Sequence, residues 1–318
     1  MSNTFAQLIS AGLATLRSGG WVRVVGAKGL NFEFKATDQH AKVRLMSNRF
    51  AHTLDLADET KSPFEPIVSG TLDDVRLSSD LAKGVLALLK MAHVTPCCEL
   101  RLGTDDSAIN SMPAACLLSL NDTIYPLVFN HCVTMPTTWS DETKLHLFSE
   151  EQDAKREHLA VICDSVKTDE APLVRVHSKC ATGDIFNSLR CDCGEQLSSA
   201  KEIIGASGNG ILIYLDQEGR GIGLRNKLAA YTLQDTGTDT FEANHQLGYE
   251  SDERTYEAAV TILKHLGVSK IRLLTNNPDK IDQLGSSIEV VARVPIIAEE
   301  EPNRQSYIDA KKQSGHLF

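Results

Sequence analysis

Residues 173–215 read LVRVHSKCATGDIFNSLRCDCGEQLSSAKEIIGASGNGILIYL, and this stretch decides the fold of the second half of the chain. The short apolar runs LVRVH at 173–177 and GILIYL at 210–215 each predict a strand. Residues 194–206 between them predict a helix, and a loop with three cysteines precedes that helix. Strands that alternate with helices are typical of an α/β domain, whose functional loops lie where strands end.

The same alternation continues to the end of the chain, where strands and helices are predicted in turn. The expected elements are a helix opened by the loop DQEGRGIGL and running through Leu233, a helix from Ser251 and Asp252 to Gly267, a strand at 270–275, a helix capped by Asn277 with Pro278 in its first position, and a strand at 289–296. We therefore expect a mixed sheet with helices in this domain.

The chain has 318 residues, which suits two domains better than one, because single hydrophobic cores stop growing near 250–300 residues. The segment 135–158 is polar and charged, so we place a boundary near residue 135, between an accessory domain at 1–135 and a catalytic domain at 136–318. The accessory domain is predicted to be a smaller α/β domain. Its expected elements are helices at 5–17 and 80–91 and strands at 21–25, 116–120 (CLLSL) and 124–129 (IYPLVF).

The net charge of −10 argues against a nucleic-acid-binding protein, which usually carries a basic face. It is compatible with a small anionic substrate, because a few convergent Arg and Lys residues can bind phosphate within an acidic protein. No apolar run approaches the ~20 residues that span a bilayer. The N-terminus also lacks the pattern of a secretory signal, so we expect a cytoplasmic protein with reduced thiols and no membrane partner.

Cys180, Cys191 and Cys193 form the first candidate site. Thiolates suit a borderline-soft ion, of which zinc is the common choice. Three protein ligands with an open position are typical of catalytic zinc, and four are typical of structural zinc. His177 and Cys163 are available as a fourth ligand. Spacing alone leaves catalytic zinc, structural zinc and the absence of a metal all open.

Three further groups are ambiguous on their own. Glu218 and Arg220 lie in a glycine-rich loop after a strand, but the spacing G-x-G-x-G does not match a dinucleotide fingerprint. Asp252 and Arg254 would point about 200° apart on a continuous helix, so they could share a substrate only at a helix start. Lys280 follows a strand-to-helix turn whose free N–H groups could bind phosphate, and is otherwise a surface lysine.

Four blocks of the sequence together resemble the successive signatures of GTP cyclohydrolase II. They are RVHSKCATGDIFNSLRCDCGEQL, YLDQEGRGIGLRNKLAAYTLQD, DTFEANHQLGYESDER and RLLTNNPDKI, in the order and with nearly the spacing of that family. The resemblance runs from about residue 156 to the end. It implies hydrolysis of GTP with opening of the imidazole ring, release of formate and pyrophosphate, and formation of 2,5-diamino-6-(5-phosphoribosylamino)pyrimidin-4(3H)-one, the first step of riboflavin biosynthesis.

The resemblance also implies roles for individual residues. One Zn²⁺ per subunit is held by Cys180, Cys191 and Cys193 without His177, and the open coordination position activates the attacking water. Asp252 corresponds to the proton acceptor. Arg254 corresponds to a residue at the α-phosphate, where we favour an electrostatic clamp over covalent attack because a guanidinium stays protonated.

Tyr231 corresponds to a tyrosine near the reacting ring, which indicates complete hydrolysis. The implied substrate-binding residues are Arg175, Val176, His177, Ser178, Lys179, Gln196, Glu218, Gly219, Arg220, Thr240, Thr275 and Lys280. Glu218 suits guanine, because a carboxylate can accept hydrogen bonds from its N1–H and 2-amino groups. Arg175, Arg220 and Lys280 suit the triphosphate. Mg²⁺ is expected with the pyrophosphate moiety. Asp216 stands where bacterial members of the family carry a basic residue. Its negative charge beside a polyanion would weaken GTP binding.

The first 135 residues faintly resemble a degenerate 3,4-dihydroxy-2-butanone-4-phosphate synthase, through ISAGLATLRSGGWVRVV and LAKGVLALLKMA. The acidic run that would hold Mg²⁺ in that synthase is missing, so we expect a non-catalytic domain that supports dimerisation. The family also implies a homodimer. Two alternatives remain: a homologue that binds guanine nucleotide as a regulatory module, and an enzyme that stops at the formamide product.

Overall fold

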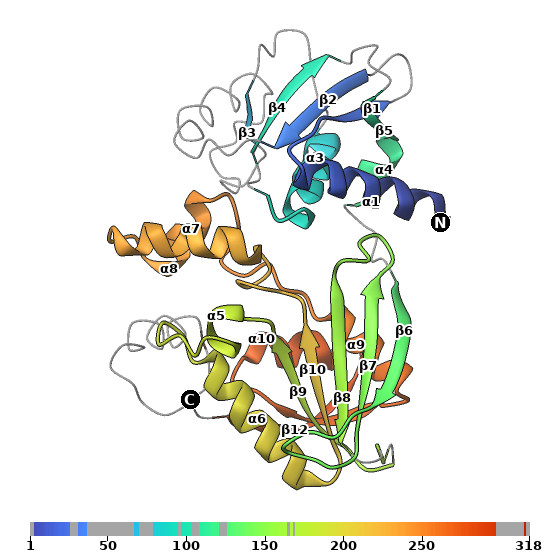
Figure 1. Cartoon of the computed structure of the whole chain (residues 1–318), viewed down its shortest axis with the longest axis vertical. Helices are drawn as coiled ribbons and strands as arrows, with labels where there is room; N and C mark the ends of the chain where they lie inside the picture. The colour runs from blue at the N-terminus through green and yellow to red at the C-terminus, as the bar shows by residue number, and fades with distance from the viewer. Residues whose placement is uncertain are drawn as a thin grey trace. The chain divides into compact units, whose positions relative to one another are not determined.

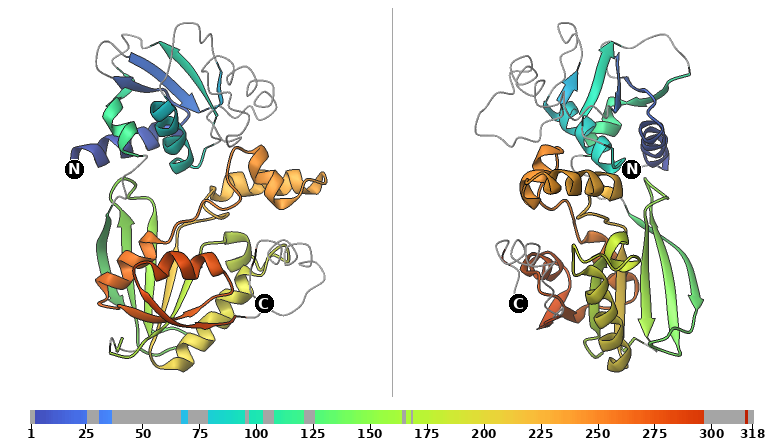
Figure 2. Two further views of the ribbon diagram at one scale, coloured as in Figure 1. Left: turned by 180° about the vertical axis from the view of Figure 1, so that it is seen from behind. Right: turned by 60° about the vertical axis from the view of Figure 1, so that its left-hand side comes forward.

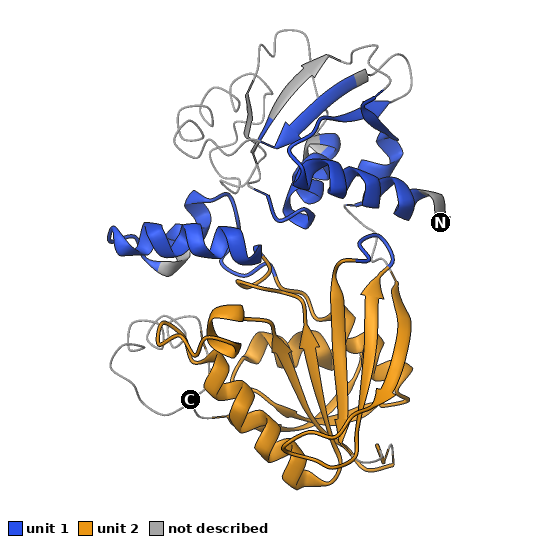
Figure 3. Cartoon of the chain, viewed as in Figure 1, with its two compact units in different colours: residues 1–125, 151–154, 222–253 blue, residues 126–150, 155–221, 254–318 orange. Residues whose placement is uncertain are grey.

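The computed structural model describes residues 3–25, 31–36, 67–69, 79–94, 97–102, 108–120, 126–163, 166–167, 169–296 and 315 (Figure 1). The chain forms two compact units, and neither is continuous in sequence (Figure 3). Unit 1 comprises residues 1–125, 151–154 and 222–253, and unit 2 comprises residues 126–150, 155–221 and 254–318. This division differs from the single boundary expected near residue 135.

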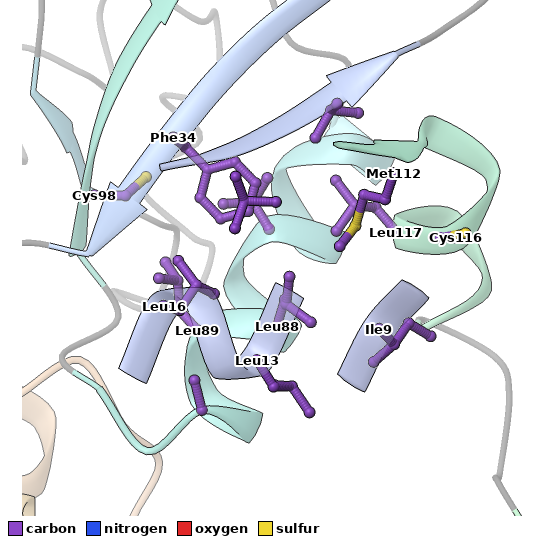
Figure 4. Packing of buried hydrophobic residues seen from close by; sticks show 14 of the residues in the cluster. Ile9, Leu13, Leu16, Phe34, Leu88, Leu89, Cys98, Met112, Cys116 and Leu117 are labelled. Atoms are coloured by element: carbon purple, nitrogen blue, oxygen red, sulfur yellow. The ribbon is translucent and has the colours of Figure 1, made fainter. Parts of the chain in front are cut away.

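Unit 1 contains a five-stranded sheet with the order β3-β4-β2-β1-β5. Its strands are β1 (Val22–Val25), β2 (Asn31–Ala36), β3 (Ile67–Ser69), β4 (Cys97–Leu102) and β5 (Asn110–Pro113). The helices α1 (Asn3–Arg17), α3 (Ser79–Met91) and α4 (Ala114–Ser119) accompany it. Apolar side chains of α1 and α3, such as Leu13 and Leu88, meet Phe34 of the sheet in one buried core (Figure 4).

Two helices from the second half of the sequence also belong to unit 1. They are α7 (Gly223–Asp235) and α8 (Thr240–Gln246), which lie side by side (Figures 1 and 2). Tyr249, fully buried after α8, donates its hydroxyl to the carbonyl oxygen of Val94 at 2.7 Å. The side chain of Lys90 pairs with Glu253 at 2.5 Å. These contacts join residues 222–253 to the end of α3 and the turn after it.

Unit 2 contains a seven-stranded mixed sheet with the order β12-β11-β9-β10-β8-β7-β6. Its strands are β6 (Leu127–Thr134), β7 (Thr143–Glu150), β8 (Glu157–Cys163), β9 (Leu173–Ser178), β10 (Gly210–Leu215), β11 (Lys270–Leu274) and β12 (Glu289–Val294). From β12 to β10 neighbouring strands are parallel, and from β10 to β6 they are antiparallel.

The two faces of this sheet are covered by different helices. Leu212 of β10 packs in one core with α6 (Cys193–Ser207). Ile211 and Ile213 of the same strand pack in another core with α9 (Glu257–His265) and α10 (Pro278–Gly285). Because alternate side chains of a strand point to opposite faces, α6 covers one face and α9 and α10 cover the other.

The α/β fold with a mixed sheet is confirmed, and so are most of the predicted elements after residue 173. One strand expected in the middle of the chain was wrong. CLLSL lies mostly in helix α4, because an apolar run this short does not separate a strand from a buried helix. The polar segment 135–158 contains β7, which pairs with β6 on one side and β8 on the other.

The helix expected from Ser251 begins instead at Glu257, so Asp252 and Arg254 precede it and are not helical. Helix α8 was not predicted. The boundary moves to residue 126 because β6 hydrogen-bonds to β7 and therefore belongs to the sheet of unit 2. No helix in the described residues combines the length and the apolar composition that crossing a bilayer requires.

Candidate metal and substrate site

The three predicted metal ligands come together at the carboxyl end of β9. Cys180 lies between β9 and the short helix α5 (Ala181–Asp184), and Cys193 is the first residue of α6. The ligand atoms of Cys180, Cys191 and Cys193 lie within 4.8 Å of one another, and the Sγ atoms of Cys180 and Cys191 are 3.7 Å apart. Zn–S bonds of about 2.3 Å at tetrahedral angles place two sulfurs about 3.8 Å apart. The donor set therefore fits zinc.

Two glycines allow this clustering. A Cβ at Gly183 would lie 2.9 Å from the Cβ of Cys193 and 3.0 Å from the Sγ of Cys191. A Cβ at Gly194 would overlap the carbonyl oxygen of Gly183. The backbones of α5 and α6 thus approach more closely than any residue with a side chain would permit. Neither glycine was singled out from the sequence, because nothing local marks a close approach between segments.

The crowding of the sulfurs also affects their protonation. Hydrogen bonding to the Cys180 sulfur raises the pKa of Cys191. The pKa of Cys193 is raised more strongly, by hydrogen bonds to the sulfurs of Cys180 and Cys191 and by burial. Three thiolates at this spacing repel one another, so a cation among them is needed to hold all three deprotonated. This electrostatic requirement agrees with a divalent metal.

The two alternative fourth ligands lie elsewhere. Cys163 belongs to β8 and is fully buried in the core beneath α6. The Nε2 atom of His177 lies 3.1 Å from Oδ1 of Asp184. Among the described residues, no further His, Cys, Asp or Glu side chain joins the cluster of three cysteines.

Two buried cations lie on the same unit. Arg175 of β9 donates to the carbonyl oxygen of Leu274 at 3.0 Å and to Oε1 of Gln196 at 2.7 Å. Burial lowers the pKa of Arg175, and Asp192 opposes this change. Lys280 donates from Nζ to the carbonyl oxygen of Val176 at 2.8 Å. Lys280 is therefore buried next to β9, and the alternative of a surface lysine is wrong.

The turn before α10 has the predicted capping geometry. The side chain of Asn277 accepts a hydrogen bond from the N–H of Asp279 at 2.9 Å, and Pro278 occupies the first turn. Thr275 is buried, and its Oγ1 accepts from the N–H of Asn277 at 3.1 Å. The start of α10 and Lys280 thus lie together at the end of β11.

The glycine-rich loop after β10 reaches the cysteine loop. Glu218 is buried and accepts hydrogen bonds from the N–H of Ala181 at 2.6 Å and of Gly219 at 3.1 Å. Arg220 has a φ of 60°, a left-handed conformation that is uncommon for a residue with a side chain. Such strain is often found at functional sites.

Asp216 and Gln217, which precede Glu218, contact predicted substrate-binding residues at the end of β9. The sequence predicted no such contacts for them. Asp216 pairs with Lys179, with Nζ and Oδ1 3.0 Å apart. The side chain of Gln217 accepts from the hydroxyl of Ser178 at 3.1 Å and donates to the carbonyl oxygen of Thr255 at 2.6 Å. The segment after α8 is thereby tied to the end of β9 close to Arg254.

Comparison with known proteins identifies the family. The model of the GTP cyclohydrolase II family matches residues 130–295, and this span includes all the cysteines of the cluster. The chain belongs to the GTP cyclohydrolase II family. It is 50% identical over 186 residues to GTP cyclohydrolase-2 of Hamiltonella defensa, a match that covers 58% of this chain and 94% of the relative. It is 48% identical over 186 residues to GTP cyclohydrolase-2 of Escherichia coli, with the same coverage of both chains.

A third relative of this GTP cyclohydrolase II chain is longer. The riboflavin biosynthesis protein RibBA of Chlorobium phaeovibrioides is 52% identical over 166 residues, which cover 52% of this chain and 40% of the relative. Residues 1–129 precede the segment that the family model matches. The resemblance of the N-terminal residues to a degenerate synthase stays a prediction.

The residues assigned by resemblance to GTP cyclohydrolase II are divided between the two units. Tyr231 lies in α7, Thr240 begins α8, and Asp252 follows them, all in unit 1. Arg254 and the remaining predicted residues lie in unit 2, and they include the metal cluster, Arg175 and Lys280. Tyr231, Thr240 and Asp252 therefore belong to a different compact unit from the other assigned residues.

Proposed function

We propose that the chain is a zinc-dependent GTP cyclohydrolase II that opens the imidazole ring of GTP in the first step of riboflavin biosynthesis. Hydrolysis of the two C8–N bonds releases C8 as formate, and hydrolysis between the α- and β-phosphates releases pyrophosphate. The product is 2,5-diamino-6-(5-phosphoribosylamino)pyrimidin-4(3H)-one. The observation that carries this proposal is the trio of sulfurs at zinc spacing, within a sequence 50% identical to GTP cyclohydrolase-2 over 186 residues.

Cys180, Cys191 and Cys193 are the proposed zinc ligands. Zinc bound by three protein ligands keeps an open coordination position and makes a water molecule nucleophilic near neutral pH. The described residues bring no fourth side-chain ligand into the cluster, which supports a catalytic site over a closed structural one.

Glu218 is the proposed reader of guanine. Its two oxygens already accept hydrogen bonds from the N–H groups of Ala181 and Gly219, which fix the carboxylate beside the cysteine loop. A carboxylate has about four lone-pair positions, so it can still accept hydrogen bonds from N1–H and the 2-amino group of guanine. Adenine does not present these donors, and the arrangement therefore favours GTP over ATP.

Arg175, Arg220 and Lys280 are the proposed contacts of the triphosphate, with Mg²⁺ on the pyrophosphate moiety. Arg175 and Lys280 are held by hydrogen bonds to backbone carbonyls, so little conformational entropy is lost when an anion binds. Arg254 is proposed to stabilise charge at the α-phosphate, Asp252 to accept a proton, and Tyr231 to act near the reacting ring. The residues that complete the proposed substrate site are Val176, His177, Ser178, Lys179, Gln196, Gly219, Thr240 and Thr275.

The decisive experiment measures formate and pyrophosphate from GTP and Mg²⁺, with and without a zinc chelator. Formate production that is lost on chelation and restored by zinc supports the proposal. Tight GTP binding without turnover would indicate a regulatory module, and a formamide product would indicate an enzyme that stops midway. Either result contradicts the proposed reaction.

A pair of cysteine variants tests the ligand assignment. Cys191→Ser should abolish zinc retention and ring opening, because a hydroxyl does not replace a thiolate for a borderline-soft ion. Cys163→Ser is the matched control and should retain a full complement of zinc, because Cys163 lies in the core beneath α6. Loss of zinc from a folded Cys163→Ser variant would instead indicate a closed structural site with Cys163 as the fourth ligand. The homodimer and the cytoplasmic location stay predictions.

A further inference from the structure

Asp184 has a set of contacts that none of the assigned roles uses. It is the last residue of α5, four positions after Cys180, and only 4% of its side chain is exposed. Its Oδ2 atom accepts hydrogen bonds from the backbone N–H of Cys180 at 3.0 Å and from the hydroxyl of Tyr214 at 2.8 Å. Its Oδ1 atom lies 3.1 Å from Nε2 of His177. One buried carboxylate thus contacts three separate groups.

Two of these groups come from the centre of the sheet. His177 of β9 and Tyr214 of β10 are paired neighbours on parallel strands. Their rings are stacked, with centroids 5.7 Å apart and an angle of 13° between the planes. Asp184 therefore connects the backbone of Cys180 to two adjacent strands.

The protonation states of the partners agree with this arrangement. Burial and the hydrogen bond to Asp184 raise the pKa of Tyr214, so its hydroxyl remains a donor. Burial lowers the pKa of His177 although Asp184 opposes the change, so the imidazole is neutral near pH 7. A neutral imidazole that donates from Nε2 to the carboxylate keeps its lone pair on Nδ1. All three partners can then donate to the carboxylate.

We propose that Asp184 is a positioning residue of the metal site, which holds the Cys180 main chain so that its sulfur stays in place beside Cys191. This inference rests on the proposed zinc site. Groups that orient metal ligands through a second layer of hydrogen bonds typically contribute 10- to 100-fold to metal affinity. Here the carboxylate acts on the backbone N–H of the ligand residue, because a thiolate has no second donor atom of its own.

Three variants separate this role from a general effect on folding. Asp184→Ala removes all three contacts, Asp184→Asn keeps the shape but replaces one acceptor oxygen with an amide nitrogen, and Tyr214→Phe removes one contact while retaining the carboxylate. The matched control is Asp153→Asn, because Asp153 is equally buried and is bound by both terminal nitrogens of Arg17 within unit 1. It alters a buried carboxylate that is paired with Arg17 of α1.

The readout is the zinc dissociation constant of the full chain, measured by competition with a chromophoric chelator, together with the thermal midpoint of the zinc-free protein. We expect Asp184→Ala to weaken zinc binding by about 10- to 100-fold, with smaller losses for Asp184→Asn and Tyr214→Phe. Asp153→Asn should lower the thermal midpoint and leave zinc affinity unchanged.

Two results would overturn the inference while leaving the proposed function intact. One is unchanged zinc affinity in a folded Asp184→Ala variant. The other is an equal loss of affinity in Asp153→Asn, which would indicate a general effect of stability. If Asp184→Ala does not fold, unchanged zinc affinity in both Asp184→Asn and Tyr214→Phe would also overturn the inference. A wild-type chain that binds no zinc would overturn the metal site itself and this role with it.

Discussion

Replacing Gly194 with alanine tests whether the close approach of α5 and α6 is what forms the metal site. The new Cβ would overlap the carbonyl oxygen of Gly183 and lie 2.9 Å from its carbonyl carbon. Carbon atoms in favourable contact are about 3.5–4.0 Å apart, so the two backbones must separate by about 1 Å. Overpacking of this kind typically costs about 1–3 kcal/mol. In a protein of this size, that lowers the thermal midpoint by about 2–10 °C.

The same displacement should disrupt zinc binding, because metal–ligand distances tolerate only about 0.2 Å. Gly205 provides the matched control, since it lies in the same helix and a Cβ there would also overlap a backbone oxygen, that of Trp139. We expect both alanine variants to lose comparable stability, and only Gly194→Ala to lose zinc in a chelator competition assay. Wild-type zinc affinity in Gly194→Ala, or equal losses in both variants, would refute the reasoning.

Three other predictions concern separate parts of the chain. Asp216→Asn should lower KM for GTP by about 1.5- to 5-fold at low salt, because Lys179 no longer has to leave an ion pair worth about 0.2–1 kcal/mol, and a raised KM would contradict this. Tyr249→Phe should cost about 1–2 kcal/mol by leaving the buried carbonyl of Val94 without its donor, and hydrogen exchange in α7 should accelerate accordingly. Burial lowers the pKa of His177, so the unfolded chain takes up this proton before the folded one as pH falls through about 6.5. Stability of the zinc-free protein should therefore fall between pH 7 and 5, and His177→Asn should reduce that dependence in urea titrations.

Local patterns were sufficient where an element is formed by its own residues. Strand β9, helix α6 and strand β10 follow from apolar runs and periodicity, and the cap at Asn277 follows from its sequence. The cysteines could be grouped because they lie on one short loop. Strand β7 was not predicted, because it lies within a polar and charged segment, two of its buried residues are the polar Thr143 and Ser149, and its identity depends on pairing with β6 and β8.

Residues that act through distant partners gave no local signal. Asp184 reads as an ordinary loop aspartate until β9 and β10 place His177 and Tyr214 beside it. Gly183 lies in the predicted loop and Gly194 at the start of the predicted helix, and neither setting shows that the approach of one backbone to another requires glycine. Both cases concern contacts between segments, which spacing along the chain does not encode.

The division into units separates residues that are adjacent in sequence. Asp252 belongs to unit 1 and Arg254 to unit 2, although only one residue lies between them. The segment 222–253 has a small core of its own, and its buried Tyr249 and Asn226 hydrogen-bond to the main chain of Val94 and His93. A core this small gains stability from such partners. The N-terminal residues therefore support the segment that carries Tyr231, Thr240 and Asp252, which gives the N-terminal part of the chain a physical role.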